Sequence, residues 1–134
     1  MRARTSGIGG PPKDRKVSWN SPQAARRSVG QRDNLFRRHP NTRFVAAHFG
    51  WHANDLPRLG RLLDEFPHVH VEAGALLYEL GRQPRAAREF FVEYQDRILF
   101  GKDSFQPSEY PYYWRVFETG DEYFDYYRDY HAFW

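Results

Sequence analysis

The stretch Arg97-Ile-Leu-Phe-Gly-Lys-Asp103 is a short apolar run that ends in glycine and then supplies a carboxylate. An earlier run, Arg43-Phe-Val-Ala-Ala-His48, has a similar form and ends in an imidazole. The earlier run is too short for a helix, and both of its alternating sets of side chains are apolar, which is typical of a strand buried on both faces of a parallel sheet. We therefore expect two strand ends directed at one site.

A third run, from His68 to Glu72, lies between these two. The strands are predicted to start at residues 43, 69 and 98, so their starts are 26 and 29 residues apart. This spacing is close to the roughly 30 residues of a strand-helix-strand unit. Strands joined by helices in this way run parallel, with right-handed crossovers. The predicted fold class is α/β, and three such strands form an arc of a barrel or the middle of an open sheet.

Helical patterns surround the predicted strands. One helix is expected over residues 22–38, because a serine followed by a proline is typical of a helix start. A second helix, capped by Asn54, carries leucines at three- and four-residue steps, which predicts one buried stripe. A short helical segment is expected at residues 75–80, and a further helix opens at Pro84.

The charge is unevenly distributed along the 134 residues, which suffice for one domain. Residues 1–38 hold ten Lys or Arg against two Asp, whereas residues 104–134 hold six Asp or Glu against two Arg. Residues 1–20 lack a hydrophobic period and are expected to form a disordered basic leader, with residues 21–134 as the domain. A basic arm is suited to non-specific binding of nucleic acid, but a solvated tail explains the same composition.

The sequence also bears on the compartment. No apolar run approaches the roughly 20 residues of a membrane span, and the first residues lack the apolar core of a secretion signal. No cysteine occurs, which excludes disulfides and thiolate metal sites. We expect a cytoplasmic protein with no membrane partner and no specific nucleic-acid partner.

Three polar residues fall at the carboxyl ends of the predicted strands, where α/β proteins collect their functional groups. These are His48, Glu72 and Asp103. With strands in sequence order, the backbones at His48 and Asp103 would be about 10 Å apart, so inward-leaning side chains could share a metal ion or a water. Imidazole and carboxylate are zinc ligands and proton-transfer groups. A hydrogen-bonded core histidine and a loop-capping aspartate fit the same spacing.

The remaining histidines give weaker signals. His68, His70 and Glu72 alternate, which places them on one face of a strand. A metal role for His68 and His70 is disfavoured, because they fall at the start and middle of the strand and only Glu72 reaches its functional end. His39 and His52 lie in predicted turns and are expected to be solvated or to cap.

Aromatic residues gather near the carboxyl terminus. Residues 105–134 hold thirteen aromatic side chains. Such side chains can stack on a sugar or a base. We favour the packing of a mobile lid against the domain, because the interleaved acidic residues would repel nucleic acid.

Three segments carry a resemblance to a known family: His39-Pro-Asn-Thr-Arg-Phe-Val-Ala-Ala-His48, Phe66-Pro-His-Val-His-Val-Glu72 and Gln95-Asp-Arg-Ile-Leu-Phe-Gly-Lys-Asp103. Together they resemble the carboxy-terminal half of the amidohydrolase-related (amidohydrolase 2) family of metal-dependent hydrolases and decarboxylases. The segment from Phe117 to Tyr126 is similar to an aromatic insertion found in one subgroup. The resemblance covers residues 28–134.

The resemblance implies a fold and roles for two residues. The fold is part of a (β/α)8 TIM barrel, with the predicted strands as the sixth to eighth strands of the barrel. His48 matches the sixth-strand histidine that activates the metal-bound water or acts as base. Asp103 matches the eighth-strand aspartate, a metal ligand and proton acceptor. The implied cofactor is a divalent metal, zinc in the first place, and the implied substrate is a small molecule.

Departures from the family pattern set the functional expectation. The paired histidines of the family's first strand and its fifth-strand histidine have no counterpart in this sequence, and Lys102 stands where the family usually has Thr or Ser. The lysine is expected to compete for the Asp103 carboxylate. We expect a fragment of a metal-dependent hydrolase or decarboxylase that is inactive alone and that self-associates or binds a complementing chain. The alternative is a non-enzymatic binding module that uses the basic arm and the aromatic tail.

Overall fold

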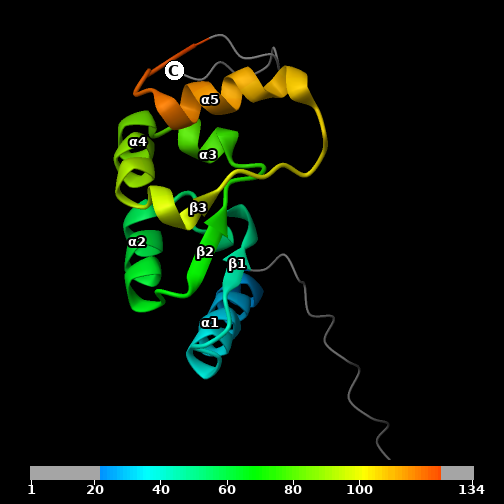
Figure 1. Cartoon of the computed structure of the whole chain (residues 1–134), viewed down its shortest axis with the longest axis vertical. Coiled ribbons are helices and arrows are strands. Elements are labelled where there is room, and N and C mark those ends of the chain that lie inside the picture. Colours follow the sequence, from blue (N-terminus) through cyan, green and yellow to red (C-terminus); the bar gives the residue numbers. More distant parts are fainter. Residues whose placement is uncertain (1–21, 125–134) are drawn as a thin grey trace, which may run out of the picture.

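A computed structural model of the chain describes residues 22–124 (Figure 1). The basic leader and the last ten residues of the aromatic tail lie outside this range. The elements, in chain order, are α1 (Pro22–Arg38), β1 (Phe44–Ala46), η1 (Ala47–Trp51), α2 (Leu56–Glu65), β2 (Val69–Glu72), α3 (Leu77–Gly81), α4 (Pro84–Glu93), η2 (Gln95–Arg97), β3 (Ile98–Leu99), η3 (Pro107–Glu109) and α5 (Tyr110–Glu118), where η marks a 3-10 helix.

The three strands form a parallel sheet in the order β1-β2-β3. Phe44 lies opposite Val69, and Val71 lies opposite Ile98. The predicted α/β class and the parallel arrangement of the strands are confirmed. The expected extent of the first strand is wrong, because β1 ends at Ala46 and the chain turns before it reaches His48.

The helices before β3 follow the sequence prediction with one correction, whereas α5 was not predicted. α1, α2 and α4 occupy the expected places, and a short α3 lies near the predicted segment. The cap of α2 is Asp55 and not Asn54, because the Asp55 side chain accepts a hydrogen bond of 3.1 Å from the Arg58 amide. A cap must lie immediately before the first helical residue, and Asp55 holds that position ahead of Leu56.

The core lies between the helices and one face of the sheet. Figure 1 shows α2 and α4 along one side of the strands, with α5 across the end of α4 and α3. The side chains buried most completely there are Phe49, Leu59, Leu63, Val69, Val71 and Leu80. Burial of such apolar side chains drives folding and orders the strand ends.

The opposite face of the sheet is uncovered by the described residues. Val45 is 60% exposed and Leu99 is 43% exposed. The expectation that the first strand is buried on both faces is therefore wrong within residues 22–124. Apolar side chains on both faces of a strand indicate what the strand can bury, but a second layer of structure must be present to cover them.

Arg97, which directly precedes β3, bonds to the end of α2 and to the start of β2. Its guanidinium donates hydrogen bonds to the carbonyls of Phe66, at 2.8 Å, and Val69, at 2.9 Å. Burial lowers the pKa of Arg97. The bond to Phe66 satisfies a carbonyl at the carboxyl end of α2, and the bond to Val69 ties the start of β3 to the start of β2.

None of the helices in residues 22–124 has the length and apolar character needed to cross a bilayer.

Candidate functional site

A left-handed turn follows β1 and carries His48. The backbone φ angles of His48, Phe49, Gly50 and Trp51 are 52°, 51°, 56° and 65°. Left-handed backbone costs a non-glycine residue roughly 1–2 kcal/mol, so the three such residues around Gly50 must be held by their surroundings. Phe49 is fully buried and contacts the Phe90 ring at 5.7 Å. Strain of this kind concentrates at functional sites.

The His48 ring is held in one orientation, and its neutral form in one tautomer. Its Nδ1 lies 2.9 Å from the carbonyl oxygen of Gly74. A carbonyl can only accept, so Nδ1 carries the hydrogen and the neutral ring keeps its lone pair on Nε2. Nε2 lies 3.8 Å from Oδ1 of Asp103, whose side chain is 65% exposed. The structure thus brings together the two residues that the sequence singled out.

Glu72, at the end of β2, lies beside the same imidazole. Its Oε2 accepts a hydrogen bond of 3.1 Å from the His48 amide and lies 3.9 Å from His48 Nδ1. Gly74 and Gly101 flank the carboxylate so closely that a Cβ at either position would overlap it. The glycine in the stretch from Arg97 to Asp103 therefore leaves space for the Glu72 side chain.

Lys102, which directly precedes Asp103, forms an ion pair with a different carboxylate. Its ammonium pairs with Glu109 in η3, and the two side chains are only 12% and 7% exposed. The ammonium also lies 5.6 Å from the centre of the Tyr113 ring, within the range of a cation-π interaction. This ion pair, whose acidic partner the sequence did not indicate, ties the end of β3 to η3 and α5.

His68 and His70 belong to the β2 region and not to the turn that carries His48. His68 precedes β2, and its Nε2 lies 3.2 Å from the Phe36 carbonyl in α1. His70 lies on the strand face shared with Val45, its partner in register. Within residues 22–124, no three His, Cys, Asp or Glu side chains come together as a metal site. His48 and Asp103 supply two donors, whereas a catalytic zinc normally takes three protein ligands.

His52 is buried and not solvated, with 5% of its surface exposed. Its Nε2 lies 3.2 Å from an Arg32 nitrogen, and because guanidinium only donates, the ring accepts this bond. Arg32 also donates to the Gly50 carbonyl, so α1 holds the far end of the left-handed turn. Burial lowers the pKa of His52, and Arg32 and Arg58 act in the same direction. The sequence around His52 indicated only a turn, so it did not predict that the side chain is buried.

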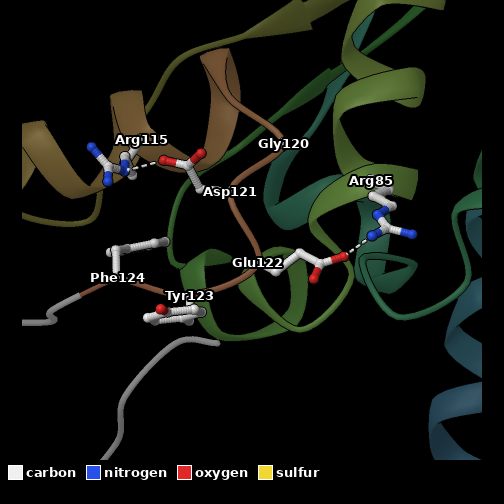
Figure 2. A pocket seen from close by; sticks show the side chains of 7 residues that line it. All are labelled: Arg85, Arg115, Gly120, Asp121, Glu122, Tyr123 and Phe124. Atoms are coloured by element: carbon white, nitrogen blue, oxygen red, sulfur yellow. Dashed lines mark ion pairs between the residues drawn. The ribbon is translucent and has the colours of Figure 1, made fainter.

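A cavity of about 740 Å³ lies away from His48, between α4, α5 and the segment after α5 (Figure 2). Two arginines face it, and each is paired with a carboxylate of the same cavity. Arg115 pairs with Asp121 at 2.7 Å, and Arg85 pairs with Glu122. Because these partners neutralise the cations, the cavity offers no strong site for a charged ligand.

The fold and the strand ends define an α/β domain that presents an imidazole and carboxylates at the carboxyl edge of a parallel sheet. The family model described as Amidohydrolase matches residues 17–126, so the chain belongs to this family. Comparisons with curated proteins and with solved structures found no match. Members of the family are generally metal-dependent and act on small molecules, and this match confirms the resemblance read from the three sequence segments.

Proposed function

We propose that this chain carries part of the catalytic site of a metal-dependent hydrolase or decarboxylase, with His48 as base and Asp103 as metal ligand. The proposal rests on the position and the tautomer of the His48 ring. The Gly74 carbonyl holds the hydrogen on Nδ1, and the lone pair of Nε2 faces Asp103 Oδ1 at 3.8 Å. A base with a fixed tautomer beside an exposed carboxylate is suited to removing a proton from water or substrate.

The sheet supports a place for the chain in a barrel. We propose that β1, β2 and β3 correspond to the sixth, seventh and eighth strands of a (β/α)8 barrel. The uncovered strand face with Val45 and Leu99 would then be the interior face, which barrels fill with side chains from other strands. His48, Glu72 and Asp103 would lie at the carboxyl end of the barrel, where catalytic residues of this fold are found.

Residues 22–124 do not by themselves fit a divalent metal, because two convergent donors are one short of a catalytic zinc site. The chain is therefore proposed to be inactive alone, with further ligands coming from a complementing chain. In the completed site, Asp103 would hold the metal, and the metal would polarise a bound water or substrate. His48 would take up the proton at Nε2.

A zinc titration of the purified full chain tests these assignments without a known substrate. We expect weak binding that falls roughly tenfold or more in Asp103→Ala, which removes the proposed metal ligand, and by a smaller factor in His48→Ala, which removes the neighbouring base. His39→Ala removes an exposed imidazole that precedes β1, whereas His48 follows it, and should leave the affinity unchanged. The same affinity in all four proteins would refute the site. Stoichiometric zinc with turnover that disappears in both site variants would refute the proposed incompleteness.

A further inference from the structure

We propose that Glu72 is a positioning residue that fixes the backbone and the tautomer of His48. The inference rests on the proposed function only in calling His48 the base. Glu72 accepts the main-chain amide of His48 at 3.1 Å, and this amide belongs to the first left-handed residue after β1. This bond anchors the peptide plane from which the left-handed turn starts, at a point where the backbone conformation is disfavoured for histidine and needs support.

The geometry shows how the main-chain bond controls the ring. With the His48 backbone held, the imidazole reaches the Gly74 carbonyl with Nδ1, and Nε2 faces Asp103. Glu72 Oε2 is 3.9 Å from Nδ1, too far for a hydrogen bond, so the Gly74 carbonyl and not Glu72 selects the tautomer directly. Glu72 acts through the backbone, by keeping the ring within reach of that carbonyl.

The Glu72 carboxylate is itself confined. The Glu72 side chain is 19% exposed, and a Cβ atom at position 74 or 101 would overlap its carboxylate. Neither glycine has a positive φ, so alanine is compatible with both backbones. Gly101→Ala would therefore displace the Glu72 side chain without changing its chemistry. Gly101→Ala therefore tests the position of the Glu72 carboxylate separately from its charge.

The test is NMR on the ¹⁵N-labelled full chain at about pH 8.5, above the ordinary titration range of imidazole. Two quantities are measured: the exchange rate of the His48 amide relative to that of the Leu63 amide in α2, and the ¹⁵N shifts of the His48 ring. In Glu72→Ala and Gly101→Ala we expect the relative exchange rate to rise about tenfold, as for the loss of one hydrogen bond. The ring should change from the Nδ1-H tautomer to a mixture.

Two variants separate positioning from a general effect on stability. Glu72→Gln keeps an oxygen acceptor and should retain slow exchange within about twofold, together with the Nδ1-H tautomer. Glu65→Ala removes a half-exposed carboxylate that pairs with Arg37, and it should leave both readouts unchanged.

Each contrary result overturns the inference. An unchanged His48 signature in Glu72→Ala would show that Glu72 does not hold the turn. Equal acceleration of the His48 and Leu63 amides would show a role in overall stability alone. Neither readout uses metal or substrate, so a failed zinc titration with these signatures intact would refute the proposed function and leave the positioning role standing.

Discussion

Gly101 illustrates how one residue determines the position of a side chain on a neighbouring strand. It lies in the strand-end stretch that precedes Asp103, and its lack of a Cβ leaves space for the Glu72 carboxylate from the neighbouring strand. Glu72 in turn accepts a hydrogen bond from the amide of His48, in the turn that follows β1. Three strand ends are therefore linked by one carboxylate.

His52 gives a pH-dependent prediction at the same scale. Burial, followed by Arg32 and Arg58, lowers the pKa of His52 in the folded state, while Asp33 and Asp55 oppose the shift. The unfolded chain therefore binds more protons near the ordinary imidazole pKa of about 6.5, and stability falls as the pH drops through that value. In urea unfolding, we expect the midpoint to fall between about pH 8 and pH 5.

His52→Gln removes this titration, so its midpoint should fall less over the same pH range. The matched control is His39→Gln at an exposed position, which should keep the wild-type dependence. A wild-type curve that is no steeper than that of His52→Gln would contradict the prediction.

At the element scale, the end of β3 is joined to η3 and α5 by the pair of Lys102 and Glu109. Both side chains are almost completely buried. Aromatic rings surround the junction: the centre of the Phe100 ring lies 5.6 Å from that of Tyr113 and 4.8 Å from that of Trp114. The sequence placed a charged residue beside the Asp103 carboxylate, but only the approach of η3 shows which partner the lysine takes. This junction fixes the segment from which Asp103 projects.

Breaking that pair should be costly. Glu109→Gln leaves the Lys102 ammonium buried without its carboxylate, and we expect a loss of about 3 kcal/mol in the free energy of unfolding, measured with urea. Glu122→Gln breaks the exposed pair with Arg85 and should cost less than about 1 kcal/mol. Similar losses in the two variants would contradict the assigned importance of the buried pair.

At the scale of the whole molecule, the sheet has one covered and one uncovered face within residues 22–124. Helices pack on the side of Val69 and Val71, while Val45 and Leu99 are exposed on the other side. Among the described strands, β1 and β3 are both edges, and unpaired edges with apolar faces favour association with another chain. These features agree with the proposed barrel segment.

We therefore expect the chain to self-associate. Size-exclusion chromatography with light scattering, at concentrations of about 100 μM, should give a mass above the 16.0 kDa of one chain. Val45→Lys should shift the mass toward that of one chain, because it charges the uncovered face.

Val92→Lys is the matched control. Val92 has the same 60% exposure, but it lies on α4. A wild-type chain that stays at 16.0 kDa, or equal effects of the two lysines, would contradict association through the sheet face.

The sequence by itself determined the α/β class, the three strand positions, the helices before β3 and the family, because hydrophobic periodicity and short motifs are local properties. It also singled out His48 and Asp103, because strand ends can be located from such patterns. Only the tertiary structure decided that the chain turns left-handed at His48, that Gly101 makes room for Glu72, and that His52 is buried. These features depend on contacts between residues more than 18 positions apart, such as Glu72 with His48 and Arg32 with His52, and no local pattern encodes them.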